Sequence, residues 1–447
     1  MKIGKKLALL MAAVLAATTF AACTGNATPS AGGGAAASNG AATPSTAGTG
    51  NQKTVKIGVA GCITGANAES GRQTVQGAEL AAKYINENGG IKALDGAQVE
   101  LVLIDNTSDP NQSALALERV LDANNDIVGI VGNPTSSALL PMLPILQKYK
   151  IPALASTAAN SSITEQGCEY IFQPSNTGGQ QSEQMIAFLQ YLAQKMGLEA
   201  KDLKIGILYE NSSWGQDVAK GNRENCEKAG LTVAIEETYP STGLSDASPI
   251  VTKLKNAGVD VLLTASYVPD TKLLVSTMTS MQYKPIIIGS GGGLGWPSLV
   301  NDMGSDTDGI CCINAWLWDA KFVQDNTEFY DNIRLQYEES HNDEFMAEQV
   351  GPAFICTMMI AEALENGQST DPTVVRDEVM KLTGENSEWF ALFNPYSAFD
   401  ENGRNVGNIG HSPMMGQWQD GRLRTVFPEE YASTNVINPL TLEPFAG

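Results

Sequence analysis

The stretch KIGVAGCITGANAESGRQTVQGAELAAKYINENGGI, residues 56–91, decides the fold class of this chain. Its apolar run at 57–60 is typical of a buried parallel strand, and a loop rich in Gly, Thr and Asn follows it. Between Val75 and Ile85 the apolar residues recur every three or four positions, which predicts a helix with one buried face. The Asn-Gly-Gly sequence at 88–90 ends that helix, because glycine accepts the left-handed conformation of a helix end. The stretch therefore predicts one βα unit with an unusually long first loop.

The alternation of strand and helix continues along the chain. Strands and helices at this spacing indicate an α/β fold whose parallel sheets have right-handed crossovers. In such sheets, ligands bind at the carboxyl ends of the strands. After Gly309 the chain becomes mostly helical, until a short hairpin around Asp420-Gly421. The expected strands are 57–60, 99–104, 127–132, 151–156, 204–209, 232–238, 259–265 and 285–289, and the expected helices are 110–123, 136–149, 180–196, 215–229, 249–257, 271–281, 327–337, 349–366 and 372–382.

Residues 1–22 resemble a bacterial lipoprotein signal peptide, with a basic start, an apolar middle and small residues before Cys23. In such a signal the cysteine is lipidated after cleavage and becomes the first residue, although Phe20 stands where an aliphatic residue is more common. A plain secretory signal with an incidental Cys23 is the alternative. Residues 24–53 are almost wholly Ala, Gly, Ser, Thr, Asn and Pro, which have too little apolar surface to offset the entropy of folding. We therefore interpret 23–53 as a lipid-anchored flexible linker.

Composition limits the remaining chain, residues 54–447, to a globular protein of about two domains. The net charge of −21 argues against nucleic acid and against anionic membrane surfaces as partners. No later stretch approaches the roughly twenty unbroken apolar residues of a membrane-spanning helix. We expect membrane contact only through the lipid anchor.

Short motifs follow one another in a characteristic order from Val55 to Ala432. They are Ile57-Gly58, Ile63-Thr64-Gly65, Gly71, Gly77, Ala81, Asn86 with Gly89-Gly90-Ile91, Asp105 with Ser108-Asp109-Pro110, Gly129 to Gly132 with Ser136-Ser137, Ile151-Pro152, Trp214-Gly215, Gly258-Val259-Asp260, and QWQDGR at 417–422 with Val426 and Pro428. Each motif is weak alone. In this order they resemble the substrate-binding proteins of ABC importers, in the family that includes the leucine/isoleucine/valine-binding proteins.

The resemblance implies the type I periplasmic-binding-protein fold, with two Rossmann-like lobes whose parallel sheets are joined by three crossing segments. It predicts lobe one as residues 54–176 and 315–415, lobe two as 177–314 and 416–432, and a C-terminal tail at 433–447. The crossings are then expected near 175–178, 312–316 and 415–418. The implied partners are a small-molecule ligand and the permease subunits of an ABC transporter, with no cofactor.

The first predicted lobe carries candidates for binding a carboxylate. Ser136 and Ser137 follow a predicted strand and open a helix, where hydroxyl and free backbone N–H groups favour anions. Ala158 and Asn160 follow the next strand in the same way. In the family these two loops hold the α-carboxylate of an amino acid, and Asn160 departs from the threonine that is common there. An ordinary helix cap is the alternative role for Ser136.

On the second lobe, the resemblance places Trp214 and Tyr267 over the ligand, where aromatic rings offer contact area with few rotors. The important departure is Gly291, because branched-chain amino-acid binders of this family carry a carboxylate near it to pair with the ligand's ammonium group. Either Asp270, Asp319 or another acid substitutes, or the ligand is not a simple α-amino acid. The remaining ligand-binding candidates are Thr64, Ser70, Asn176, Thr177 and Trp316.

The first choice of ligand is a hydrophobic, branched-chain or aromatic amino acid, because the glycine run at 291–293 predicts an apolar and roomy second-lobe side. The alternative is a carboxylate-bearing or flat heterocyclic compound without an ammonium group. An enzyme is disfavoured, because the two histidines, His341 and His411, have no metal spacing and no nucleophile or phosphate-loop motif is present. A ligand-sensing receptor of the same fold is a further alternative. The cysteines other than Cys23 fit no disulfide framework and no zinc site, and Cys62 lies beside the predicted cleft.

Overall fold

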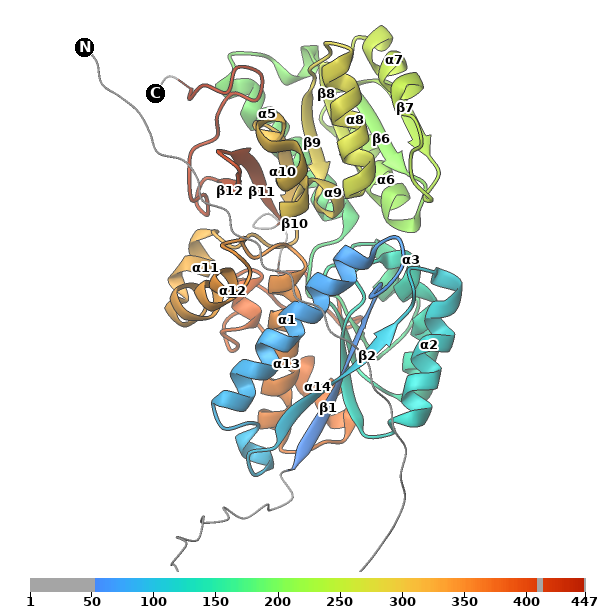
Figure 1. Cartoon of the computed structure of the whole chain (residues 1–447), viewed down its shortest axis with the longest axis vertical. Helices are drawn as coiled ribbons and strands as arrows, with labels where there is room; N and C mark the ends of the chain where they lie inside the picture. Colours follow the sequence, from blue (N-terminus) through green and yellow to red (C-terminus); the bar gives the residue numbers. More distant parts are fainter. Residues whose placement is uncertain (1–52, 408–412, 446–447) are drawn as a thin grey trace, which may run out of the picture. The chain divides into compact units, whose positions relative to one another are not determined.

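The computed structural model describes residues 53–407 and 413–445. The predicted signal peptide, Cys23 and almost all of the linker lie outside the described residues. All described residues fall within one compact unit. It contains two sheets, and its elements are labelled in Figure 1.

The first sheet has five strands, all parallel, in the order β2-β1-β3-β4-β5. Neighbouring side chains of a strand point to opposite faces. Ile130 and Val131 of β3 accordingly belong to two separate apolar clusters, one on each face. The strands are β1 (Thr54–Gly61), β2 (Gln98–Asp105), β3 (Ile127–Gly132), β4 (Ala153–Ala155) and β5 (Ile171–Phe172), and the connecting helices include α1 (Ala68–Glu87) and α2 (Pro110–Ala123).

The second sheet has seven strands in the order β12-β11-β10-β9-β8-β6-β7, with an antiparallel hairpin at one edge. Leu262 and Leu263 of its β8 again divide between two clusters, so helices cover both faces. The strands are β6 (Lys204–Glu210), β7 (Thr232–Tyr239), β8 (Val261–Ala265), β9 (Ile286–Ser290), β10 (Cys311–Asn314), β11 (Met414–Gln419) and β12 (Arg422–Phe427); the helices include α5 (Gly178–Lys195), α6 (Ser213–Lys228), α7 (Ser248–Ala257), α8 (Val268–Ser280), α9 (Gly291–Leu294) and α10 (Pro297–Met303).

A long helical excursion separates β10 from its neighbour β11. Its helices are α11 (Lys321–Asp325), a π-helix (Glu328–Ile333), α12 (Arg334–Ser340), α13 (Val350–Gly367) and α14 (Pro372–Val379). Helix α13 is buried nearly all round and packs on α1 and on β3 of the first sheet, as Figure 1 shows for α1. Gly77 of α1 permits this contact, because a Cβ there would lie 2.1 Å from the Val350 carbonyl oxygen. The segment that connects β10 to β11 in the second sheet thus packs against the first sheet.

Three expected elements differ from the structure. The helix predicted at 136–149 is broken into α3 (Ser136–Leu139), a 3₁₀ turn (Leu140–Met142) and α4 (Leu143–Tyr149), because Pro141 and Pro144 lack the N–H that a continuous helix needs. The helix predicted at 327–337 begins instead as the π-helix. The strand predicted at 151–156 is only the three residues of β4.

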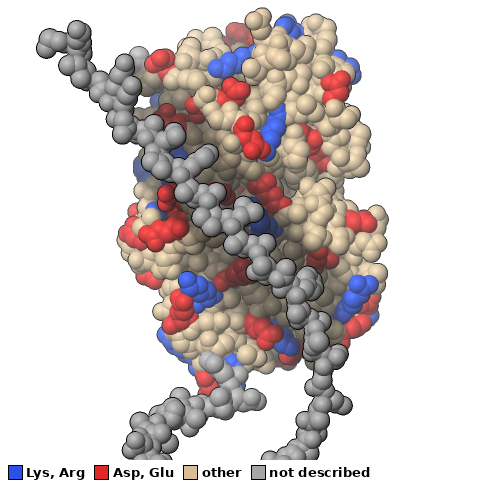
Figure 2. Space-filling view, viewed as in Figure 1, with Lys and Arg blue, Asp and Glu red and all other residues tan. Residues whose placement is uncertain are grey.

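Acidic and basic side chains are interspersed over the face drawn in Figure 2. The face drawn has no continuous basic patch of the kind that binds nucleic acid. Among residues 53–407 and 413–445, no helix is both long and apolar enough to cross a membrane.

Candidate functional site

A small cavity of about 30 Å³ lies where the carboxyl ends of strands from both sheets meet. The loop after β3 and the loop after β4 line it from the first sheet, and the ends of β8 and β9 line it from the second. Helices α1, α5, α6 and α9 and the segments just before α10 and α13 complete the wall. The lining residues are Ser70, Pro134, Thr135, Ser136, Thr157, Ala159, Gln181, Trp214, Tyr267, Ser290, Gly291, Gly292, Trp296, Glu348 and Gln349.

Five of the predicted ligand-binding residues line this cavity: Ser70, Ser136, Trp214, Tyr267 and Gly291. They come from five separate stretches of the chain, which the two sheets bring together. The other predicted residues do not line it: Thr64, Ser137, Ala158, Asn160, Asn176, Thr177 and Trp316.

Asn160 lies directly behind the first-sheet wall and links the two sheets. Its backbone N–H donates to Ser136 Oγ at 3.1 Å. Its side-chain amide donates to the carbonyl oxygen of Ser213, the first residue of α6, at 2.6 Å. Helix α3, which Ser136 opens, has only four residues, so the donors of this wall are hydroxyl and N–H groups rather than a long helix dipole.

The other predicted residues outside the wall have structural partners. The Thr64 hydroxyl donates to Asp105 Oδ2 at 2.7 Å, and Thr177 caps α5 in a capping box. Asn176 Oδ1 accepts from Gln181 Nε2 at 2.9 Å. Trp316 is buried in the core, where its ring covers Gly351 and meets Phe329 edge to face. Ser137 is half-buried in α3, and Ala158 is fully buried.

Aromatic rings form the second-sheet wall. Trp214 and Tyr267 have ring centroids 5.2 Å apart. Trp296, which nothing in the sequence separated from the neighbouring tryptophans, also lines the cavity, while Trp318 is a core residue. The indole N–H of Trp296 is buried and has no hydrogen-bond partner in the described part of the chain. It is a donor available to a ligand.

The expectation of a roomy glycine run at 291–293 is wrong, because other groups fill the space. A Cβ on Gly291 would lie 2.1 Å from Glu348 Oε2, and one on Gly292 would lie 3.0 Å from the Trp214 ring. A Cβ on Gly293 would lie 2.1 Å from the Ser266 carbonyl oxygen. These glycines therefore permit close packing rather than leaving room for a bulky ligand.

Glu348 is the one carboxyl group among the lining residues, and the sequence analysis missed it. Its exposed fraction is 7%. Its Oε1 accepts a hydrogen bond from the backbone N–H of Ala315 at 2.6 Å. Burial raises the pKa of this carboxyl from 4.5 to about 7, against the opposite effect of the Ala315 hydrogen bond. The only sequence signal was its place directly before the long apolar helix predicted at 349–366.

The acids named as substitutes for a carboxylate at 291 lie elsewhere. Asp270 accepts from the Leu244 N–H at 2.7 Å, and Asp319 accepts from the Thr425 N–H at 3.1 Å and the Ser433 hydroxyl at 2.5 Å. Neither lines the cavity. Cys62 is also outside the wall, with its Sγ 3.4 Å from Thr135 Oγ1. The six described cysteines are all free and buried, and the described residues contain no cluster suited to a metal ion.

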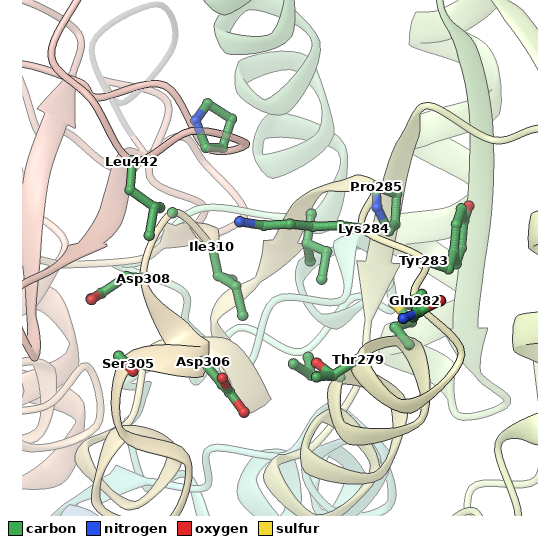
Figure 3. A pocket seen from close by; sticks show the side chains of 15 residues that line it. Thr279, Gln282, Tyr283, Lys284, Pro285, Ser305, Asp306, Asp308, Ile310 and Leu442 are labelled. Atoms are coloured by element: carbon green, nitrogen blue, oxygen red, sulfur yellow. The ribbon is translucent and has the colours of Figure 1, made fainter.

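A larger cavity of about 390 Å³ lies at the opposite, amino end of β9 (Figure 3). Its lining comes from the second-sheet half and the C-terminal segment, including Lys284, Pro285, Ile310 and Leu442. Lys284 Nζ donates to the Leu440 carbonyl oxygen at 3.1 Å. This cavity touches no residue of the first sheet, so we place the candidate site at the smaller one.

Two α/β sheets that enclose one cavity at the carboxyl ends of their strands define a protein that binds a small molecule between two lobes. Residues 54–421 match the model of the periplasmic binding protein family, and the chain belongs to that family, with the type I fold. The family consists of solute-binding proteins of ABC transporters, not enzymes. The chain accordingly has a solute-binding role outside the cytoplasm.

Several relatives are similar over most of their length. Leu/Ile/Val-binding protein homolog 8 of Brucella suis biovar 1 (strain 1330) is 30% identical over 407 residues, which cover 88% of this chain and 95% of the relative. The branched-chain amino acid transporter substrate binding protein LivJ from Streptococcus pneumoniae, in complex with isoleucine, is 21% identical with a TM-score of 0.70, covering 83% of this chain and 98% of LivJ. An ABC transporter solute binding protein from R. palustris, in complex with 4-hydroxybenzoate, is 20% identical with a TM-score of 0.69, covering 86% of this chain and 98% of that protein.

Proposed function

We propose that this chain is an extracytoplasmic solute-binding lipoprotein that captures a hydrophobic, branched-chain or aromatic α-amino acid and delivers it to the permease of an ABC importer. The two lobes are those expected from the sequence, 54–176 with 315–415 and 177–314 with 416–432. The ligand lies between them.

One observation carries the proposal: hydroxyl groups from one sheet and aromatic rings from the other face each other across a single cavity. On the first-sheet side the Ser136 hydroxyl accepts from the Asn160 N–H and can donate its proton to a carboxylate, whereas the Thr157 hydroxyl donates to Gln349 Oε1. Trp214 and Tyr267 offer apolar area on the opposite side, which suits a hydrophobic side chain. The names of the curated relatives and the isoleucine bound to the pneumococcal neighbour support the same substrate class.

The size of the cavity supports capture by closure. Its 30 Å³ is far below the roughly 300 Å³ at which pockets for small organic ligands begin. An amino acid therefore needs the lobes further apart than they are here, both to enter and to be held. Contacts from both sides would then favour lobes closed around the ligand over lobes fully open.

Thermal melting of the purified protein against the twenty amino acids tests the proposal. A ligand that binds the folded chain raises the melting temperature in a concentration-dependent way. We expect leucine, isoleucine, valine or phenylalanine to raise it. If none does and a compound without an ammonium group does, the amino-acid assignment is wrong.

A second candidate ligand is an aromatic or heterocyclic carboxylate. The R. palustris neighbour was solved with 4-hydroxybenzoate, and the unpartnered Trp296 N–H together with the aromatic wall suits a flat acid. The same melting experiment with benzoates and purines distinguishes the two ligand classes.

The anchor is part of the proposal. Lipidation of Cys23 would hold the protein at the outer face of the membrane, and residues 24–53 would then form a tether of roughly 30 Å. A tethered binding protein keeps its ligand close to the importer.

A further inference from the structure

Glu348 is a buried carboxyl group that faces the candidate ligand cavity. It lies just before α13, and its side chain extends to Gly291 at the start of α9 in the second sheet's half of the fold. A buried carboxylate is costly unless a cation or several hydrogen bonds compensate it. The described residues that line the cavity include no Lys, Arg or His. No side chain of the described wall therefore compensates this carboxyl group when it is ionised, and a cationic ligand group could.

The carboxyl group of Glu348 occupies the space that a side chain at position 291 would fill. A Cβ at position 291 would lie 2.1 Å from Glu348 Oε2, 2.6 Å from its Oε1 and 2.6 Å from its Cδ. Any larger residue at 291 would displace the carboxyl group. An acid at 291 and Glu348 in its present position are thus mutually exclusive.

We propose that Glu348 binds the ammonium group of the substrate, and that it supplies from the α13 side of the cavity the negative charge that position 291 lacks. The inference rests on the proposed function, since it requires an amino-acid ligand. It assigns to Glu348 the selection for ligands with an ammonium group against the corresponding acids without one.

Ala315 holds the carboxyl group in place. Its N–H donates to Glu348 Oε1 at 2.6 Å, and Ala315 directly follows β10. The fixed oxygen orients the group, and the other oxygen, Oε2, lies nearest the Gly291 position. Because Ala315 lies in a segment predicted to cross between the lobes, ligand contact at Glu348 is linked directly to the expected hinge.

Other buried acids do not fit this role. Glu210 is also buried, but its Oε1 accepts from the Ser212 hydroxyl and it does not line the cavity. Asp217 accepts from the Ser161 N–H at 3.1 Å and hydroxyl at 2.9 Å, and it is outside the wall as well. Burial raises the pKa of Glu210 too, so a raised pKa alone does not single out Glu348. Glu348 differs from Glu210 and Asp217 because it lines the cavity.

The test compares matched ligand pairs by isothermal titration calorimetry near pH 8. The pairs are L-leucine with isocaproate and L-phenylalanine with hydrocinnamate, where each acid is the amino acid without its ammonium group. Glu348→Gln should weaken amino-acid binding about ten- to hundredfold, the usual cost of a lost hydrogen bond to a charged group. It should leave the affinity for the des-amino acid unchanged or improved. Glu210→Gln, which also removes a buried acid, is the matched control and should change neither.

A second test moves the acid from position 348 to position 291, and it applies even if Glu348→Gln alone folds poorly. Gly291→Asp should impair binding because it overlaps Glu348, and Gly291→Asp combined with Glu348→Ala should restore amino-acid binding at least in part. The wild-type protein at pH 5.5 should also discriminate less between leucine and isocaproate than at pH 8.

The outcomes distinguish the role of Glu348 from the proposed function. If the wild type binds leucine or phenylalanine and Glu348→Gln binds them equally well, Glu348 is not the ammonium partner although the proposed function stands. If the wild type binds isocaproate or hydrocinnamate and no amino acid, both the proposed function and the role of Glu348 are refuted.

Discussion

Replacing Glu348 with glutamine should stabilise the ligand-free protein at alkaline pH and much less at acidic pH. Burial raises the pKa of this carboxyl in the folded chain from 4.5 to about 7. Well below pH 4.5 both the folded and the unfolded chain carry the neutral carboxyl, and the group costs nothing. Between pH 4.5 and pH 7 the unfolded chain is already ionised while the folded chain keeps the carboxyl neutral, which favours unfolding. The wild type therefore loses stability over this window.

The size of the effect follows from the shift. The pKa of Glu348 is 4.5 in the unfolded chain and about 7 in the folded chain. At about 1.36 kcal/mol for each unit of pKa, this difference lowers the free energy of unfolding by about 3 kcal/mol at pH 8. At pH 5 the same relation leaves less than about 1 kcal/mol. Glutamine has nearly the same shape and no charge, so it should recover most of this energy at pH 8.

Urea unfolding followed by tryptophan fluorescence at pH 5 and pH 8 measures the difference. The control is Glu100→Gln on β2, an exposed glutamate whose replacement should change stability by less than about 0.5 kcal/mol at either pH. Equal stabilisation by Glu348→Gln at both pH values would show that packing, not ionisation, sets the effect. No stabilisation at pH 8 would show that the carboxylate is already compensated without ligand.

Three other predictions concern the ligand, the lobes and the anchor. Ser136→Ala should weaken a carboxylate ligand by about 1–3 kcal/mol in calorimetry, the cost of one charge-assisted hydrogen bond, and an unchanged affinity would remove Ser136 from the site. Small-angle scattering at saturating ligand should show a smaller radius of gyration than the free protein, because closure brings the lobes together, and an equal radius would argue against closure. Cys23→Ser should abolish labelling by a lipid precursor and release the protein from cells, whereas a variant that stays membrane-bound would point to another anchor.

Much of the fold was predictable because the spacing of apolar residues along the sequence indicates where strands and helices form. The helix at Pro110–Ala123 and the strand at Ile127–Gly132 have the predicted bounds, and the hairpin turns at Asp420-Gly421 as the turn residues indicate. The broken helix after Ser136 was not predicted, although its two prolines were visible. The π-helix at Glu328–Ile333 leaves no comparable mark in the sequence.

Residues that follow a strand were the best candidates for the site, although three of them, Ser137, Ala158 and Asn160, do not line the cavity. Ser136 and Tyr267 belong to that class, and both line the cavity. Glu348 was missed, and Trp296 could not be separated from Trp316 and Trp318 as the ligand-facing tryptophan, because their place depends on how a remote segment packs against the strand ends. The glycines at 291–293 were misinterpreted for the same reason: sequence shows that a side chain is missing there, but not which neighbour fills the space.

The central claim is that one amino acid is held between the two sheets by groups from both. A crystal structure of the protein grown with the amino acid that raises its melting temperature most tests this directly. We expect the ligand to bind in the cavity between Ser136 and Trp214, with its ammonium nitrogen about 3 Å from a Glu348 carboxyl oxygen. A ligand bound in the larger cavity beside Lys284, or one whose ammonium group faces away from Glu348, would contradict it.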